Sequence, residues 1–272
     1  MNTALQSHLK NLKLSGAANT LETRIEEATK GNLSYLEFFE LLIQDEITNR
    51  TNNANRKRMQ KARFRQHKTI EEFNFNYQPS INRQVIYGLA TCEFIRKKEN
   101  IAFIGPPGTG KSHLASAIGI KAVHQGYSVL FTTVSHMLEE LYISRADNSF
   151  KQKLKKFINP ELLILDELGL KKLNQNSVDD FYEIIAGRYE QKSTIITSNK
   201  AFDEWGHILY DPVLATAILD RFVHHCHFVT IKGESFRMKE RQGLLDNDSQ
   251  KKPAKRGRPP KNKQLDDKGG DD

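Results

Sequence analysis

The chain has 272 residues, of which 38% are hydrophobic, so it is long enough to bury one substantial domain core with smaller appendages. Its 41 Lys and Arg residues exceed its 33 Asp and Glu residues, and the net charge of +8 favours an acidic partner. Two cysteines, Cys92 and Cys226, argue against a disulfide-rich secreted protein, and no apolar run approaches the length of a membrane span, so we expect a soluble cytoplasmic protein.

Residues 1–75 are predicted to form a small helical N-terminal domain. Ser34 and Glu37 have the spacing of a capping box that begins a helix. Helical spacing also places four apolar residues on one face of that helix, where they form an apolar stripe: Leu36, Phe39, Ile43 and Ile47.

The end of this region, from Arg50 to Lys68, is rich in basic residues and has no acidic residue. A solvated helix face normally mixes both signs of charge, so this segment favours a polyanion such as DNA. An exposed basic face that balances acidic surface elsewhere in an oligomer is the alternative. The candidate DNA-binding residues are Arg56, Lys57, Arg58, Lys61, Arg63 and Arg65.

Residues 76–244 alternate short apolar runs with longer helical segments, which is typical of an α/β fold with a parallel sheet between helices. Gly126 is predicted to end one helix, and Ser177 to cap another with Asp180 in its first turn. The expected strands are Ile101–Ile104, Ser128–Thr132, Leu162–Leu165, Thr194–Thr197 and Phe228–Ile231.

A phosphate-binding P-loop follows the first of these strands. The segment has the pattern G-x-x-x-x-G-K-[ST], in which glycines allow backbone N–H groups to approach phosphate oxygens closely. The lysine would contact the β- and γ-phosphates, and the serine hydroxyl would bind Mg²⁺. The residues predicted to bind a nucleoside triphosphate are Gly105, Pro106, Pro107, Gly108, Thr109, Gly110, Lys111 and Ser112.

Polar residues after later strands complete the predicted site. Asp166 and Glu167 end an apolar strand, as in a Walker B segment, where Asp166 would support Mg²⁺ and Glu167 would polarise the attacking water. Asn199 follows the next strand and could hold that water at the γ-phosphate. Arg221, near a predicted helix end, could neutralise charge on the transferring phosphoryl group, often from a neighbouring subunit. Taken singly, Asn199 could be a turn residue and Arg221 an ion-pair partner of Asp220.

The run His224–His227 raises the possibility of a zinc site. Consecutive residues of one strand point to opposite faces, so we expect no metal there.

Residues 245–272 are predicted to be a disordered basic tail. Within it, Arg256-Gly257-Arg258-Pro259 resembles an AT-hook, a module whose Arg-Gly-Arg core fits an A·T minor groove, so Arg256 and Arg258 are candidate DNA contacts. A non-specific basic tail is the alternative.

Several of these motifs together resemble the IstB family of AAA+ ATPases. The matching segments are Leu33–Phe39, Gly105–Ser112, Leu162–Glu167, Thr197–Asn199, Leu219–Arg221 and Ile231–Arg237. Members of that family assist the transposase of bacterial insertion sequences and are relatives of the DnaC helicase loader. The similarity extends over nearly the whole chain except the last twenty or so residues.

The resemblance implies an AAA+ fold, ATP and Mg²⁺ as ligands, and an oligomer that assembles on double-stranded DNA and stimulates a cognate transposase. It also implies ATP sites between subunits, with Arg221 acting as a finger in the next subunit's site and Arg237 as a second phosphate sensor. The family pattern commonly has Tyr where this chain has Phe236, which leaves the arginine intact.

Two other functions share the nucleotide-binding residues. A replicative helicase loader would have the same site but would bind a ring helicase. A small-molecule P-loop kinase is disfavoured because Asp166, Glu167 and Asn199 are suited to positioning water, and no acceptor pocket is apparent in the sequence.

Overall fold

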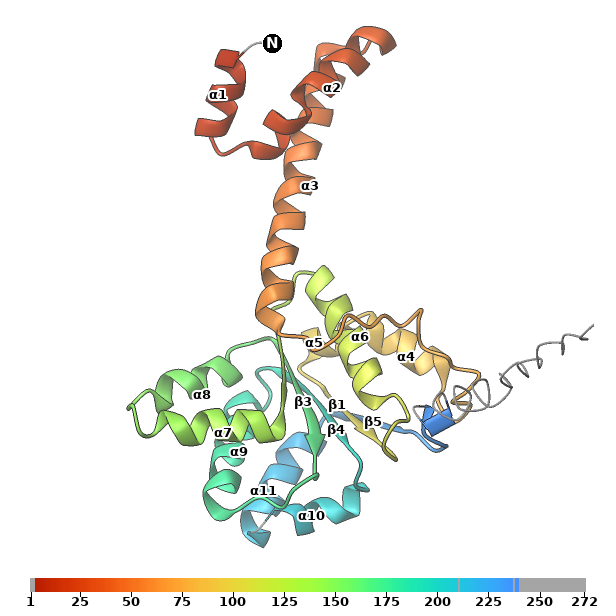
Figure 1. Cartoon of the computed structure of the whole chain (residues 1–272), viewed down its shortest axis with the longest axis vertical. Helices are drawn as coiled ribbons and strands as arrows, with labels where there is room; N and C mark the ends of the chain where they lie inside the picture. The colour runs from red at the N-terminus through yellow and green to blue at the C-terminus, as the bar shows by residue number, and fades with distance from the viewer. Residues whose placement is uncertain (1–2, 210, 237, 240–272) are drawn as a thin grey trace, which may run out of the picture.

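A computed structural model describes residues 3–209, 211–236 and 238–239. Three helices come first, namely α1 (Thr3–Asn11), α2 (Ser15–Gly31) and α3 (Tyr35–Ala62). An α/β domain follows, and α3 carries the N-terminal helices away from it as a stalk (Figure 1). Its elements are α4 (Arg83–Ala90), α5 (Glu93–Lys97), β1 (Asn100–Ile104), α6 (Lys111–His124), β2 (Val129–Thr133), α7 (Val134–Ser144), α8 (Phe150–Ile158), β3 (Leu162–Leu168), α9 (Gln175–Arg188), β4 (Ser193–Ser198), η1 (Phe202–Glu204), α10 (Trp205–Ile208), α11 (Pro212–Val223) and β5 (Cys226–Thr230).

The five strands form one parallel sheet in the order β2-β3-β4-β1-β5. All five predicted strands are present, with ends that differ from the predicted ones by three residues or fewer. In a parallel sheet the carboxyl ends of all strands lie at one edge, so the segments that follow β1, β3 and β4 meet there. The predicted fold class is therefore confirmed.

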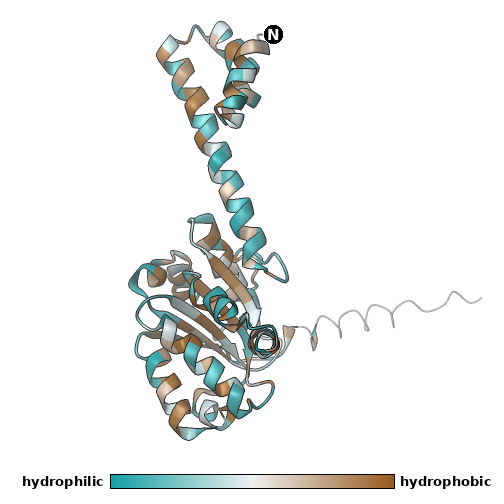
Figure 2. Cartoon of the chain, turned by 90° about the vertical axis from the view of Figure 1, so that its left-hand side faces the viewer, coloured by the Kyte–Doolittle hydropathy of each residue, from teal (hydrophilic) through white to brown (hydrophobic). Residues whose placement is uncertain are grey.

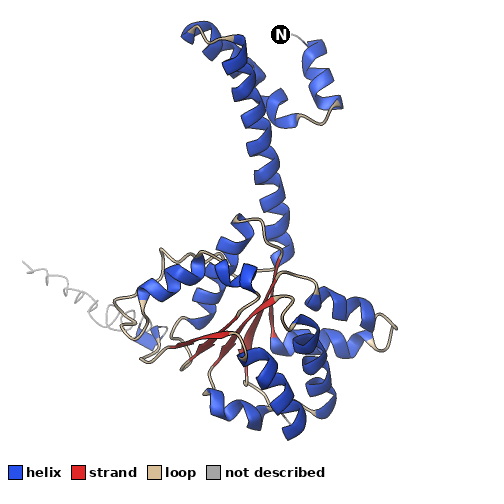
Figure 3. Cartoon of the chain, turned by 180° about the vertical axis from the view of Figure 1, so that it is seen from behind, coloured by secondary structure: helices blue, strands red, loops and turns tan. Residues whose placement is uncertain are grey.

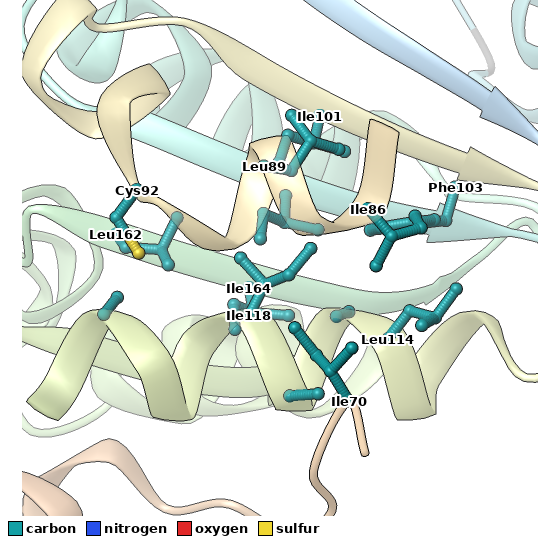
Figure 4. Packing of buried hydrophobic residues seen from close by; sticks show 14 of the residues in the cluster. Ile70, Ile86, Leu89, Cys92, Ile101, Phe103, Leu114, Ile118, Leu162 and Ile164 are labelled. Atoms are coloured by element: carbon teal, nitrogen blue, oxygen red, sulfur yellow. The ribbon is translucent and has the colours of Figure 1, made fainter. Parts of the chain in front are cut away.

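Helices cover both faces of the sheet, as Figure 3 shows from behind. Alternate strand residues point to opposite faces, so Ile101 and Phe103 of β1 join one core while Ala102 and Ile104 join the other. The first core packs the sheet against α4, α5 and α6 (Figure 4). The second packs it against α7 to α11.

Arg188 is fully buried at the end of α9 and ties three elements together. Its Nε donates to Thr194 Oγ1 (2.9 Å), its Nη1 to the carbonyls of Phe157, Ile158 and Pro160 (3.0, 2.8 and 2.9 Å), and its Nη2 to the carbonyl of Ser193. Burial lowers its pKa to about 9, so the guanidinium stays charged at neutral pH. These bonds fix the start of β4, the strand that leads into the site.

Two predictions about helix starts have different outcomes. The capping box is confirmed, because the Ser34 side chain accepts from the Glu37 N–H and the Glu37 side chain accepts from the Ser34 N–H. The prediction that Ser177 caps α9 was wrong, since Asn174 Oδ1 accepts the Ser177 N–H (3.0 Å) and is the cap. Asp180 therefore lies beyond the first turn, where it is buried and paired with Arg145.

The apolar stripe predicted on α3 is largely exposed. Leu36, Phe39, Ile43 and Ile47 are 68%, 57%, 37% and 51% exposed, and Figure 2 shows hydrophobic patches at that end of the stalk. The face that packs on α2 instead carries Leu42, with Phe38 partly buried beside it. The repeat of apolar residues identified a face correctly, but not the face that a neighbouring helix covers.

The chain from the end of α3 onward packs on the α/β domain. Ala62, Ile70 and Phe73 are buried in the same core cluster as β1 and α6. Within the described residues, no helix is long and apolar enough to cross a membrane.

Candidate functional site

The P-loop connects β1 to α6 at the carboxyl edge of the sheet. Gly108 and Gly110 have φ angles of +78° and +97°, which side chains with a Cβ rarely adopt. A Cβ on Gly110 would also lie 2.4 Å from the Phe73 ring, and a Cβ on Gly108 would lie 2.0 Å from Ser235 Oγ. The loop therefore requires glycine at both positions, although the motif itself fixes only Gly110 of the two.

Lys111 begins α6 and is largely buried. Its Nζ donates to the carbonyl oxygens of Gly105 and Pro106, at 2.7 Å each, so the ammonium group lies over the loop. Within the loop, the Thr109 hydroxyl donates a 2.8 Å hydrogen bond to the Pro106 carbonyl. The backbone N–H groups at the start of α6 add the partial positive charge of a helix N-terminus.

Asp166 links the P-loop to the two neighbouring strands. It is 3% exposed, and its Oδ1 accepts the hydroxyls of Ser112 (2.7 Å) and Thr197. Ser112 comes from α6, Asp166 from β3 and Thr197 from β4, so three elements meet at one carboxylate oxygen. Sequence reasoning gave Thr197 no role, because only the strand order brings it between the P-loop and the two acidic residues.

Glu167 is exposed although both neighbours in β3 are buried. The pairing of β3 with β4 is irregular between Leu165 and Leu168, and Glu167 has a φ of +65°. Its N–H donates to Thr197 Oγ1 (3.0 Å), which holds this conformation. An irregularity of this kind turns a side chain away from its regular direction, and here the carboxylate of Glu167 reaches the cleft.

A cleft of about 770 Å³ contains these groups. Its lining includes the P-loop and the start of α6 (Gly108–His113), Asp166, Glu167 and Phe236. The opposite wall comes from the segment after the stalk and includes Arg65, Lys68, Phe73, Tyr77 and Gln78. That segment is held at the P-loop by His113, whose Nε2 lies 2.6 Å from the Thr69 carbonyl.

Arg65 therefore lies at a position that the sequence did not predict. It was predicted as a DNA contact, yet its side chain lines the nucleotide cleft together with the P-loop. Tyr77 and Gln78 are further residues of this cleft to which the sequence assigned no role, whereas for Phe73 the sequence left open a place in the adenine pocket or a packing role.

Asn199 and Arg221 do not line the cleft. Asn199 directly follows β4, and its Oδ1 is buried without a hydrogen-bond partner among the described residues. Arg221 lies in the last turn of α11, where its Nη1 donates to the Ala217 carbonyl (2.9 Å) and its guanidinium lies 5.2 Å from the ring centroid of Tyr182. In a single subunit the structure thus brings together Ser112, Asp166 and Glu167, but not Arg221.

The residues present fit a magnesium nucleotide. Mg²⁺ prefers oxygen ligands, and Ser112 Oγ and the buried carboxylate of Asp166 are hard oxygen donors 2.7 Å apart. The glycine-lined loop and Lys111 offer donors for phosphate oxygens.

The other predicted DNA contacts lie at the lower end of α3 and just after it. Arg56, Lys57, Lys61 and Arg63 are exposed, whereas Arg58 is partly buried. None of them forms an ion pair with an acidic residue in the described part of the chain. Figure 2 shows this part of the stalk as strongly hydrophilic. Arg237, Arg256 and Arg258 lie outside the described residues.

The reason given against a metal at the histidines was wrong in part. His224 and His225 lie in the turn after α11 and not on β5. They face the same carboxylate oxygen, Glu190 Oε1, at 3.8 and 3.9 Å, on the exposed edge of the sheet away from the P-loop. The Tyr189 hydroxyl lies 2.9 Å from His224 Nδ1. Both cysteines are free thiols, and burial raises the pKa of Cys92 to about 11.

Comparison with known proteins identifies close relatives. Residues 7–243 match the family described as IstB-like ATP binding protein. The chain is 40% identical over 238 residues to a Pseudomonas aeruginosa protein named as an ATP-binding protein of insertion sequence IS21, covering 88% of this chain and 90% of the relative. It is 39% identical over 251 residues to a Geobacillus stearothermophilus protein named likewise for insertion sequence IS5376, covering 92% and 99%.

Solved structures share the fold. A crystal structure of DnaI matches with a TM-score of 0.54 and 24% identity, over 61% of this chain and 91% of that chain. The replication initiator DnaA, bound to AMPPCP and single-stranded DNA, matches with a TM-score of 0.50 and 21% identity, over 66% and 54%. At these identities the likeness concerns the fold alone.

Proposed function

Because the chain belongs to the IstB-like family of ATP-binding proteins, we propose that it hydrolyses ATP within an oligomer on DNA and thereby assists a transposase. The observation that carries the proposal is the shared Thr197 hydroxyl. It bonds Asp166 and fixes the backbone of Glu167 beside the P-loop, so one carboxylate is held inward and the other is presented to the cleft.

This arrangement gives each acidic residue a distinct role. Asp166 and Ser112 would hold Mg²⁺, which neutralises charge on the phosphate oxygens. The exposed Glu167 carboxylate has room to accept a proton from a water molecule in the cleft. Asn199, which directly follows β4 at the same edge of the sheet, is proposed on sequence grounds to hold that water. Its Oδ1 is buried outside this cleft without a partner among the described residues, so the side chain would have to turn toward the cleft to do so.

We propose that Arg221 acts in the site of a neighbouring subunit. Its own cleft does not include it, yet hydrolysis needs a cation to neutralise the charge that develops on the transferring phosphoryl group. Arg221 is partly exposed at the end of α11, and among the described residues it pairs with no carboxylate. An oligomer in which α11 of one subunit faces the P-loop of the next would complete the site.

The proposed DNA contacts are basic residues at the end of α3 and just after it. Among the described residues none of them has an ion-pair partner, so their positive charge is available to a phosphate backbone: Arg56, Lys57, Arg58, Lys61 and Arg63. Arg256 and Arg258 of the C-terminal segment are proposed as further contacts on sequence grounds alone.

The proposal is tested by DNA binding and particle size, measured by gel shift and light scattering at two salt concentrations. The three nucleotide states are no nucleotide, ADP and a slowly hydrolysed ATP analogue. We expect large DNA-bound assemblies only with the ATP analogue, and weaker binding at the higher salt. A Lys111→Ala variant, whose P-loop lacks the ammonium group, is the control and should form none.

DNA binding that ignores the nucleotide, with no growth in particle size, would contradict the proposal. It would favour the alternative function, a replicative helicase loader whose partner is a protein. Binding of a purified transposase, with and without the ATP analogue, then distinguishes the two functions.

A further inference from the structure

Two buried polar atoms at one end of the nucleotide cleft have no partner among the described residues. They are the Tyr77 hydroxyl and Gln78 Oε1, and Gln78 is only 2% exposed. Buried polar atoms are almost always hydrogen-bonded, so an unpaired one in the wall of a cleft calls for a partner such as a water molecule or a ligand atom. Both residues line the same cleft as the P-loop.

The orientation of the Gln78 amide follows from its other contact. Its Nε2 donates to the Glu234 carbonyl (3.1 Å), so the oxygen is left as the acceptor. The reverse orientation would place Oε1 against that carbonyl, two acceptors facing each other. Gly233 allows this close approach, because a Cβ there would lie 2.7 Å from Oε1.

Tyr77 is held in place by packing. Its ring meets Phe236 edge to face, with centroids 5.2 Å apart and planes at 77°, and the Lys239 ammonium lies 4.9 Å from its centroid. The Phe236 N–H donates to the Gly108 carbonyl (3.0 Å), so this aromatic wall adjoins the P-loop directly.

The strand order shows which part of a nucleotide would reach these two residues. Asp166 and Glu167 lie near the end of β3, which is on one side of β1, whereas Phe236 follows β5, on the other side. With the γ-phosphate directed to the acidic residues, the base of the nucleotide would lie at the opposite end, beside Tyr77 and Gln78.

We propose that Gln78 and Tyr77 read the edge of adenine and make the site selective for ATP. Gln78 Oε1 accepts a hydrogen bond from the exocyclic N6 amine, and the Tyr77 hydroxyl donates to the adjacent ring nitrogen. Guanine and hypoxanthine carry an oxygen at position 6, which would face Oε1 as a second acceptor. The inference rests on the proposed nucleotide site and adds the residues that choose the base.

The test compares ATP with ITP, because the base of ITP has an oxygen and a ring N–H in place of the amine and ring nitrogen of adenine. Affinities of the full chain for both nucleotides with Mg²⁺ are measured by calorimetry. We expect the unmodified chain to bind ATP roughly 10- to 100-fold more tightly than ITP.

Two variants and one control assign this preference to the two residues. Gln78→Leu should reduce the difference between ATP and ITP to less than about threefold, and Tyr77→Phe, which removes only the hydroxyl, should reduce it in part. Gln84→Leu changes an exposed glutamine of α4 that does not line the cleft and should keep the full preference. Thermal unfolding of each variant checks that it folds.

Equal affinity of the unmodified chain for ATP and ITP would overturn the inference while leaving the nucleotide site intact. Unchanged selectivity in folded Gln78→Leu and Tyr77→Phe would overturn it as well. Failure of the folded chain to bind either nucleotide would overturn the nucleotide site itself, and this inference with it.

Discussion

At the scale of single residues, Thr197 determines how two adjacent carboxylates differ. Its hydroxyl donates to Asp166 and accepts the N–H of Glu167, so Asp166 stays buried while Glu167 is turned outward. Two chemically similar side chains can therefore serve separate roles, one at the metal and one at the water.

Glu167→Gln tests the role of the outward carboxylate. An amide cannot accept the proton of water, so we expect ATP hydrolysis to fall by about 100-fold or more while ATP affinity changes little. Phosphate release and nucleotide binding are measured on the same preparation. The control Glu139→Gln removes an exposed carboxylate of α7 and should behave like the unmodified chain. Hydrolysis by Glu167→Gln at the unmodified rate would show that the Walker B assignment is wrong.

Lys111, Ser112, Asp166 and Glu167 could be identified from the sequence because each belongs to a short motif next to a strand that the sequence itself predicts. The sequence did not identify Thr197, Tyr77 or Gln78, because their roles depend on neighbours that strand order and chain return bring together. The same holds for Arg65. The sequence around a basic residue does not show whether its side chain lies near a nucleotide phosphate or near a DNA phosphate.

At the scale of elements, Glu46 of α3 serves as the N-terminal cap of α2. It is 4% exposed, and its Oε2 accepts the N–H groups of Gly16 (2.6 Å) and Ala17 (3.2 Å). Residue 14, where a local cap would stand, is a leucine with no side-chain acceptor. The hydrogen bond from Arg50 holds the pKa of Glu46 below its usual value, and the two amides add to this against the effect of burial.

This cap predicts an acid-sensitive helical pair. Because the folded-state pKa of Glu46 is depressed, its stabilisation is complete above its unfolded pKa of about 4.5 and is lost as the pH falls through the folded value. Glu46→Gln should cost roughly 1 kcal/mol at pH 7 and flatten the pH dependence of stability below about pH 4.5. Asp45, whose pKa Arg24 lowers, and Glu37, whose pKa the Ser34 hydrogen bonds lower, contribute to the pH dependence that remains.

Amide hydrogen exchange of residues 16–21 in α2 measures the effect. The control Glu40→Gln changes an exposed carboxylate of the same helix and should leave the exchange rates as they are. If Glu46→Gln exchanges at the unmodified rate at pH 7, the cap contributes no stability.

The helices also show why part of the fold escaped prediction. The capping box at Ser34 depends on residues three apart, so it was readable in the sequence. The stripe of Leu36, Phe39, Ile43 and Ile47 was readable as a face, but its exposure depends on the direction from which α2 approaches α3. The spacing of apolar residues shows which side chains share a face of a helix, but it does not show which face a neighbouring helix covers.

At the scale of the whole molecule, the separation of Arg221 from the cleft makes a prediction about subunits. Arg221→Ala should lower hydrolysis by about 1,000-fold or more and leave ATP affinity within threefold. The control Arg96→Ala removes a surface arginine that pairs with Glu93 and should retain activity.

Mixing two inactive variants distinguishes action between subunits from action within one. Arg221→Ala keeps its P-loop, and Lys111→Ala keeps its arginine, so a mixed oligomer contains sites with both groups. We expect hydrolysis to recover on mixing. No recovery, together with lost ATP binding by Arg221→Ala, would indicate a role within the subunit through its contact with Tyr182.

The stalk gives the molecule a mechanical property. α3 has 28 residues, so as one continuous helix it extends about 42 Å from its base to the α1 and α2 end (Figure 1). Its base runs into the segment that walls the nucleotide cleft. A lever arm of this length amplifies motion at its fulcrum, since a tilt of about 10° would move the far end by about 7 Å. A small change in the width of the cleft would therefore displace any partner bound to the α1 and α2 end by several ångströms.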